Sequence, residues 1–235
     1  MTHPAANPTK RNRKRTTFAS YSNRCDGHRQ NSRQSGDCAE GSGILSKGMR
    51  LFIGIQFSSS IRQEIAFWMR SLIQRIPDPD RRLHWISDVN LHLTLKFIGE
   101  TPDSELARLE SALRSCAKEN RSFSLRLTSL GHFGGRVIWL GADGDLSALS
   151  ALAASIHQLC RAGRFTAEGG SFQPHVTLAR SKKSPKTLSF STLPKTLTSR
   201  SFGPINVETI SLIQSILTPS GAAYKTLATF PLKAS

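Results

Sequence analysis

The sequence has few cysteines, few acidic residues and no long hydrophobic run. Its 235 residues include four cysteines and no C-x-x-C pair, so neither a zinc finger nor a disulfide framework is indicated. No stretch reaches the roughly 18–20 apolar residues that a membrane helix needs, and the N-terminus lacks the apolar segment of a signal peptide. We therefore expect a cytoplasmic protein with reduced thiols and no membrane span.

The shortage of acidic residues leaves a strongly basic chain. The 32 Lys and Arg stand against 16 Asp and Glu, which gives a formal net charge of +16. A field of that sign attracts polyanions, although the same charge also serves solubility alone. The net charge therefore makes RNA, DNA and an anionic lipid surface candidate binding partners, and it does not distinguish among them.

Residues 1–48 differ in composition from the rest of the chain. They carry nine Lys and Arg against three Asp and Glu and have almost no apolar periodicity. Such a segment cannot bury enough apolar surface to offset its ordering entropy, so we expect a disordered basic extension before a folded domain of residues 49–235. Three interpretations compete: a nucleic-acid-binding arm, an organelle presequence, or a start codon placed upstream of the working start. The abrupt change at Met49 favours the last.

From Arg50 the hydrophobic pattern alternates between strands and helices. A strand–helix–strand unit occurs twice, ending once at His92 and once at His175, which predicts an α+β fold of two similar lobes that face each other. The expected strands are 51–57, 91–98, 123–130, 137–140 and 176–179, the expected helices run from about 58 to 76, 103 to 117 and 146 to 160, and a hairpin joins 207–217 to 224–232.

The two units end in the same short motif. His92-Leu-Thr-Leu95 and His175-Val-Thr-Leu178 both lie in apolar runs that are typical of strands. Because side chains alternate between the faces of a strand, each histidine shares a face with the threonine two residues on. One H-x-T in a strand is explained as well by an ordinary core histidine. Two in matching contexts predict a site.

A pair of imidazoles with a pair of hydroxyls suits phosphodiester cleavage. Near neutral pH one histidine can act as base while the other acts as acid. The hydroxyls of Thr94 and Thr177, with a nearby cation such as Arg180, can hold the phosphoryl oxygens. No Asp or Glu cluster accompanies the histidines, so we expect no metal and no other cofactor.

At these residues the chain resembles a known family. The strings His92-Leu-Thr-Leu-Lys-Phe-Ile-Gly99 and Pro174-His-Val-Thr-Leu-Ala-Arg180 resemble the two signature motifs of the 2H phosphoesterase superfamily. They are most similar to those of its RNA 2′,3′-cyclic phosphodiesterases, also called 2′-5′ RNA ligases. The resemblance extends from Met49 to Leu232. Two positions depart from the family pattern, His84 where Arg is frequent and Gln173 where His is frequent, and they bear on substrate preference more than on the reaction.

The resemblance implies a bilobal fold in which two antiparallel sheets, related by a pseudo-twofold axis, line a central cleft with helices outside. It also implies that the partner is RNA with a 2′,3′-cyclic phosphate end, or a cyclic nucleotide, and that the product is a 2′-phosphate. We assign His175 as the proton acceptor that activates water and His92 as the proton donor to the 3′ oxygen; the reverse assignment stays open. Phe172 and Phe133 are candidates for base stacking, with ordinary core aromatics as the alternative.

One further activity is compatible with this interpretation, and two other functions compete with it. The same chemistry in reverse would join a 5′-hydroxyl RNA to a cyclic phosphate end without ATP. A basic RNA-binding module without turnover is a second candidate, which the intact histidines and threonines disfavour. A phosphodiesterase of small cyclic nucleotides is the third, which the basic core disfavours. We expect a monomer, because no exposed apolar stripe is indicated.

Overall fold

The computed structural model describes residues 48–76, 78, 83–165, 171–181, 190, 192–219 and 221–234. These belong to a single structural unit that spans residues 44–235. The strands are β1 (Met49–Gln56), β2 (Leu83–Trp85), β3 (His92–Thr101), β4 (Phe123–Phe133), β5 (Val137–Gly144), β6 (His175–Ser181), β7 (Phe202–Val207), β8 (Thr209–Thr218) and β9 (Gly221–Pro231). The helices are α1 (Ser59–Arg75), α2 (Asp103–Glu119), α3 (Leu146–Ala162) and α4 (Lys195–Thr198), with a 3-10 turn η1 (Asp88–Asn90).

The predicted extension lies outside the described residues except for Gly48, so its disorder and the start at Met49 stay predictions. Within the described part of the chain, none of the helices has the length and apolar composition to cross a membrane.

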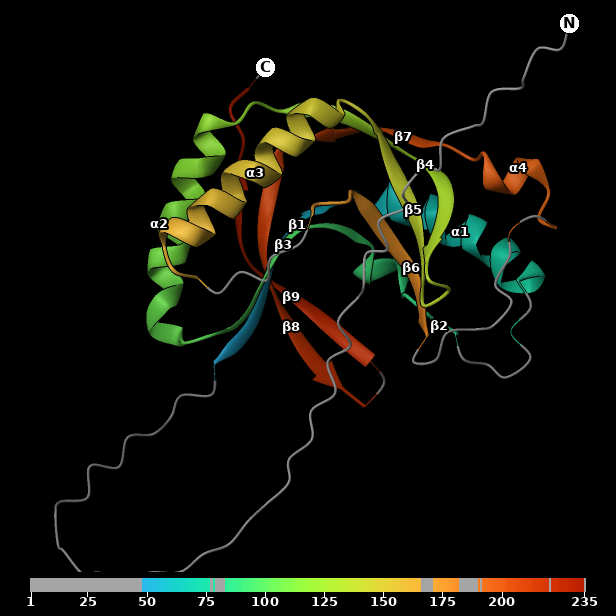
Figure 1. Ribbon diagram of the computed structural model, residues 1–235, viewed down its shortest axis with the longest axis horizontal. Coiled ribbons are helices and arrows are strands. Elements are labelled where there is room, and N and C mark those ends of the chain that lie inside the picture. Colours follow the sequence, from blue (N-terminus) through green and yellow to red (C-terminus); the bar gives the residue numbers. More distant parts are fainter. Residues whose placement is uncertain are drawn as a thin grey trace, which may run out of the picture. The chain divides into compact units, whose positions relative to one another are not determined.

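The strands form one curled antiparallel sheet (Figure 1). Its order is β7-β4-β5-β6-β3-β1-β8-β9, with β2 paired to β6. The two motif strands, β3 and β6, therefore lie side by side at the centre. The outer neighbour of β3 is β1, and the outer neighbour of β6 is β5. In the chain, helix α1 lies between β1 and β3, and helix α3 lies between β5 and β6. The expected α+β class is confirmed.

The expected division into two sheets needs a correction. The two halves of the sheet are hydrogen-bonded to each other through β3 and β6, which pair at one position, Leu93 with Val176. Both residues are fully buried. Pairing satisfies main-chain N–H and C=O groups that two separate sheets would leave bare at their edges in the interior. The halves are thus joined at the point where the two motifs begin.

Two helices, α1 and α3, pack across the centre onto the half of the sheet opposite to the strand that each follows. The helix α1 follows β1, yet it packs on β7, where the Trp68 and Phe202 rings lie 5.2 Å apart. The helix α3 follows β5, yet it packs on β3 and on α2. Figure 1 shows α2 and α3 together at one side and α1 with α4 at the other. This exchange ties the two halves together behind the motif strands.

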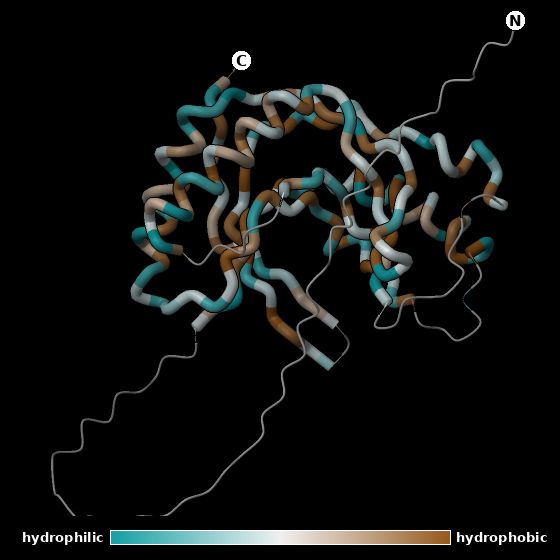
Figure 2. The backbone as a smooth tube through the Cα atoms, viewed as in Figure 1, coloured by the Kyte–Doolittle hydropathy of each residue, from teal (hydrophilic) through white to brown (hydrophobic). Residues whose placement is uncertain are grey.

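The core lies between the helices and the sheet. Figure 2 shows hydrophobic residues in the central strands, while hydrophilic and hydrophobic residues alternate along the helices. Helix α1 begins where predicted, since the Ser58 hydroxyl accepts a hydrogen bond from the Ile61 main-chain N–H. The buried helix residues recur every three or four positions, with one adjacent pair in each helix, as expected for a helix with one apolar face. They are Ile65, Trp68, Met69 and Leu72 in α1, Leu109, Leu113, Cys116 and Ala117 in α2, and Leu149, Leu152, Ala153, Ile156 and Cys160 in α3.

Candidate active site

The two H-x-T motifs lie together on one face of the sheet. Leu93 and Val176, opposite each other, point into the core. Side-chain alternation along β3 and β6 then places the two histidines, His92 and His175, and the threonines that follow them on the opposite face. All four side chains are partly exposed. The structure thus brings together the four residues that the sequence singled out.

Each imidazole is held by the main-chain carbonyl two residues before it. His92 Nδ1 donates a hydrogen bond to Asn90 O at 2.7 Å, and His175 Nδ1 donates to Gln173 O at 2.8 Å. A proton fixed on Nδ1 leaves Nε2 as the atom available for chemistry. In His92 that Nε2 lies 3.1 Å from Thr94 Oγ1, whose hydroxyl donates to it. Both rings are therefore oriented by the backbone of their own strand.

Aromatic side chains surround the two imidazoles. The His92 ring lies 4.8 Å from Phe52 and 5.0 Å, edge to face, from Tyr224. The His175 ring lies 5.0 Å from Phe133, also edge to face. These neighbours shield the rings from water. Phe133 thus lies beside one catalytic candidate, and its role in base stacking stays a prediction.

The pKa of each imidazole is lowered from its ordinary value of 6.5. Burial is the largest cause for both, because it disfavours the charged form. The carbonyl of Asn90 or Gln173 raises the pKa, while the charge of Arg180 lowers it, and His92 is lowered further by His175. Both rings are thereby biased toward the neutral form that can accept a proton.

A β-bulge places Arg180 on the face of the histidines. In β6, Thr177 pairs with Trp139 and Ala179 pairs with Ile138, so the residue between them is unpaired on β5. A bulge reverses the faces of the residues that follow it, and Arg180 therefore turns to the side of Thr177. Its guanidinium donates to Thr177 Oγ1 at 3.3 Å. The sequence named Arg180 as a cation near the site, and the bulge puts it there.

A tryptophan fills the same face beside Thr177. Trp139 is paired with Thr177, and two glycines make room for its indole. A Cβ on Gly131 would lie 2.2 Å from the indole, and a Cβ on Gly141 would lie 3.3 Å from it. The Trp139 Nε1 atom is buried and has no hydrogen-bond partner within the part of the chain that the structure describes. Together with Phe133, 5.2 Å away, it forms an apolar wall beside His175.

Several of these residues carried no chemical signal in the sequence. Asn90 links the site to the β8–β9 hairpin, since its Nδ2 donates to Ala222 O at 2.9 Å. Phe52 and Tyr224 lie within the stretch that the family resemblance covers, Met49 to Leu232, and had no assigned role. Only the register of β1, β3 and β9 brings their rings against His92, and register is not readable from one sequence.

The remaining candidates fall into two groups. His84 pairs with Arg180 across β2 and β6 and is exposed, so it borders the site. Phe172 is partly buried and packs against the core, which agrees with the alternative offered for it. His132 and His157 point to main-chain groups elsewhere, the Gly135 N–H and Leu95 O.

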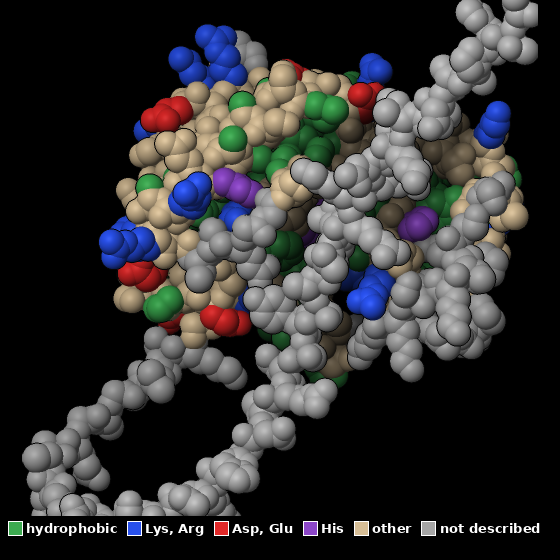
Figure 3. All heavy atoms as spheres, viewed as in Figure 1, with side chains coloured by type: hydrophobic (Ala, Val, Ile, Leu, Met, Phe, Trp, Pro, Cys, Tyr) green, Lys and Arg blue, Asp and Glu red, His purple; other side chains and the backbone are tan. Residues whose placement is uncertain are grey.

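On the face of the molecule that Figure 3 shows, charge does not single out one region of the described residues. Figure 3 shows Lys and Arg side chains scattered over the face in view, with Asp and Glu among them. Among the described residues no three His, Cys, Asp or Glu side chains group as metal ligands would. The expectation of a metal-free site stays a prediction.

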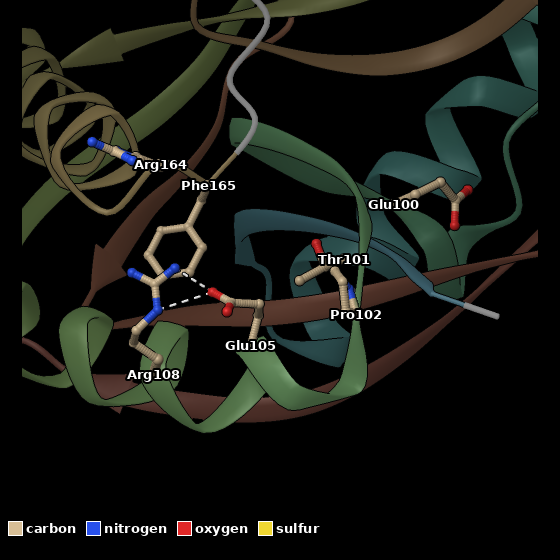
Figure 4. A pocket seen from close by; sticks show the side chains of 7 residues that line it. All are labelled: Glu100, Thr101, Pro102, Glu105, Arg108, Arg164 and Phe165. Carbon is tan, nitrogen blue, oxygen red and sulfur yellow. Dashed lines mark hydrogen bonds and ion pairs between the residues drawn. The ribbon is translucent and has the colours of Figure 1, made fainter. Parts of the chain in front are cut away.

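A pocket of about 220 Å³ lies far from the histidines, at the C-terminal end of β3 (Figure 4). Two of its charged side chains are paired with each other: Arg108 forms an ion pair with Glu105, and Arg108 also lies over the Phe165 ring, 4.2 Å from its centroid. Its lining residues are Glu100, Thr101, Pro102, Glu105, Arg108, Arg164 and Phe165.

The comparisons with known proteins agree with this geometry. The family model described as the 2′-5′ RNA ligase superfamily matches residues 64–215, a stretch that holds both motifs. The chain belongs to this superfamily. Its members include the RNA 2′,3′-cyclic phosphodiesterase of Archaeoglobus fulgidus, which is 30% identical over 186 residues, 77% of this chain and 99% of that protein. The Escherichia coli protein of the same name is 33% identical over 148 residues, 61% of this chain and 78% of that protein.

Solved structures of the superfamily share the fold. LigT of Escherichia coli in its apo form superposes with a TM-score of 0.62 at 24% identity, over 80% of this chain and 99% of LigT. LigT complexed with 3′-AMP superposes with a TM-score of 0.63 at 24% identity, over 79% of this chain and 99% of LigT. The curled α+β architecture is therefore that of LigT.

Proposed function

We propose that this protein hydrolyses the 2′,3′-cyclic phosphate ends of RNA to 2′-phosphates, with His92 and His175 as its acid–base pair. The observation that carries the proposal is the pair of matched motifs on adjacent strands, each with its Nε2 presented on one face of the sheet. The names of the superfamily relatives support the substrate. LigT has been crystallised with 3′-AMP, which supports a nucleotide in this fold.

In the proposed reaction, water attacks the phosphorus and the bond from phosphorus to the 3′ oxygen breaks. His175 Nε2 takes the proton of the attacking water, and His92 Nε2 gives a proton to the departing 3′ oxygen. Each histidine then exchanges its proton with solvent, which restores the starting state. The exchanged roles, with His92 as base, use the same geometry.

Charge explains how one of the two half-buried imidazoles would become protonated. Arg180 and burial lower both pKa values in the free protein. An anionic cyclic phosphate bound beside the histidines would raise their pKa values, which is the opposite of the effect of Arg180. It would therefore favour the protonated form of one imidazole. Thr94, Thr177 and Arg180 would donate hydrogen bonds to the phosphoryl oxygens, where the negative charge must be held.

Finer features of the predicted architecture belong to this proposal. We infer that the two halves of the sheet act as two lobes, related by a pseudo-twofold axis, with the substrate in a cleft between them. Phe133, edge-on to His175, would stack on the base of the reacting nucleotide, and Phe172 would support it from the core. A monomer in the cytoplasm, without a metal or other cofactor, completes the proposal.

The reverse reaction follows from the same pair of histidines. A 5′-hydroxyl RNA in place of water would attack the cyclic phosphate and give a 2′-5′ linkage without ATP. The name of the superfamily supports this activity as a second candidate. Adding a 5′-hydroxyl oligonucleotide to the assay below would reveal it as a longer product.

The decisive experiment uses an RNA oligonucleotide with a 2′,3′-cyclic phosphate end, with EDTA present, and separates 2′- from 3′-phosphate products. We expect a 2′-phosphate product, and H92A and H175A each to lower the rate by about 10²–10⁴-fold, the usual worth of acid–base catalysis. His132, exposed on β4, provides the control variant H132A, which should keep its activity. Full activity in H92A would overturn the mechanism. RNA binding without turnover would identify a binding module instead.

A further inference from the structure

The bulge that positions Arg180 has a counterpart in the other motif strand. In β3, Thr94 pairs with Gly54 and Lys96 with Ile53, so Leu95 is unpaired on β1. Leu95 stands three residues after its histidine, as does the unpaired Leu178 of β6. The two bulges thus occupy the same position in the two motifs, and both reverse the faces of the residues that follow.

Phe97 is therefore the counterpart of Arg180, five residues after its histidine. It pairs with Phe52 across β1 and β3, and the two rings lie 5.8 Å apart. Since Phe52 also touches the His92 ring, Phe97 lies on the face of the histidines. Phe52 is 1% exposed and Phe97 is 47% exposed. The position that holds the phosphate-facing cation in one half holds an exposed aromatic ring in the other.

The distance from the reacting centre indicates which part of a substrate Phe97 would meet. Three residues of strand separate it from Thr94, about 10 Å at the usual rise. Arg180, at the same separation from Thr177, reaches back to it with its long side chain, whereas the shorter side chain of Phe97 would not reach the phosphate that the histidines handle. A nucleotide preceding the cyclic one would lie along the sheet, and unpaired bases bind by stacking on aromatic side chains.

A cation lies farther along the same face. Arg50 and Phe52 are two residues apart in β1 and share a face. The charges of Arg50 and Arg180 both act on the Tyr224 hydroxyl, whose pKa burial raises, so both guanidinium groups lie near the ring that touches His92. Arg50 also has a carboxylate neighbour, because it pairs with Glu100. Beyond it lies a pocket of about 410 Å³, lined among others by Arg50, Glu100, Ser215 and Leu217.

We propose that Phe97 and Arg50 form a second nucleotide subsite, which binds the base and phosphate of the nucleotide on the 5′ side of the cyclic one. Phe97 stacks on the base, and Arg50 meets the phosphate at the mouth of the pocket. The subsite makes the protein prefer RNA ends over cyclic mononucleotides. This inference rests on the proposed function, because it extends the same site by one nucleotide.

The test compares kcat/KM for a 2′,3′-cyclic mononucleotide and for a trinucleotide with the same cyclic end. F97A should reduce the preference for the trinucleotide about tenfold, within the range expected for loss of one base stack, and F97Y should restore it. R50Q should also weaken the trinucleotide reaction and reduce its dependence on salt, because a phosphate contact is lost. Phe67 on α1 is 73% exposed, so F67A is the matched control and should leave the preference unchanged.

The outcomes separate the subsite from the reaction itself. If the wild-type protein hydrolyses both substrates and F97A lowers the two kcat/KM values by the same factor, Phe97 only supports Phe52 and His92, and the subsite is wrong. An unchanged preference in F97A overturns it too. If the wild-type protein hydrolyses neither substrate, the proposed function fails, and the subsite with it.

Discussion

The two histidines take their orientation from main-chain carbonyls and not from carboxylates. A carboxylate partner would raise an imidazole pKa strongly by its charge, whereas a carbonyl fixes the tautomer with a smaller effect. Burial is the largest cause of the lowered pKa values, the carbonyl hydrogen bond acts against it, and the charge of Arg180 adds a smaller lowering. In the proposed mechanism Arg180 would therefore both hold the phosphate and shift the pH range of the reaction.

The first prediction concerns the single residue Arg180. Replacing it in R180Q removes a positive charge that lowers the pKa of His92 and of His175, so both pKa values should rise. Both limbs of the kcat/KM profile should then move to higher pH, and its maximum should fall by up to about 10²-fold through the lost phosphate contact. The measurement is the pH profile on a cyclic-ended oligonucleotide.

A second arginine provides the control for that profile. Arg200 is exposed and paired with Glu64, so R200Q should leave both limbs in place. An R180Q profile that falls in height without moving would mean that Arg180 binds phosphate but does not tune the histidines.

At the scale of the element, matched bulges decide what each motif strand presents. After the bulge at Leu95, Lys96 turns to the core and is 6% exposed. It lies near Cys160 of α3, where burial raises the thiol pKa to about 11 and the Lys96 charge acts against that rise. In β6 the corresponding residue is Ala179, which is fully buried. Regular alternation would have sent Phe97 and Arg180 to the core instead.

The pairing of β1 with β3 yields a second prediction. Gly54 lies opposite Thr94, and a Cβ there would be 2.9 Å from Leu93 O and 3.7 Å from His92 Cδ2. Because the nearest atom belongs to the main chain, G54A must push the strands apart behind His92. We expect a loss of about 1–3 kcal/mol in the free energy of unfolding together with a lower kcat, measured by urea unfolding and by turnover.

A core variant separates displacement from instability. Leu113 of α2 is fully buried, and L113A should lower the free energy of unfolding by about 2–5 kcal/mol without moving His92. Its kcat should stay near wild type at a temperature where it is folded. A G54A protein with a normal kcat would show that β1 and β3 can separate without disturbing His92.

At the scale of the whole molecule, the lowered histidine pKa values link stability to pH. The unfolded chain binds protons near the ordinary pKa of 6.5, while the folded chain binds them only at lower pH. The contribution of these two histidines to the free energy of unfolding is fully present above pH 6.5. It is lost as the pH falls through the folded pKa values. The free energy of unfolding should therefore decrease on acidification from pH 7.5 to 5.5, and the double variant H92N/H175N should show a smaller decrease. An equal decrease in both proteins would assign the effect to other groups.

The sequence by itself determined the α+β class and the main helices and strands. It also determined that His92 shares a strand face with Thr94, and His175 with Thr177. These follow from local patterns, because the two-residue period of a strand decides which side chains share a face. Tertiary structure alone decided that the motif strands meet in one sheet, that bulges turn Phe97 and Arg180 to the site, and that Phe52 and Tyr224 enclose His92. Pairing, register and bulges depend on contacts between segments distant along the chain, and a single sequence does not encode them as a local pattern.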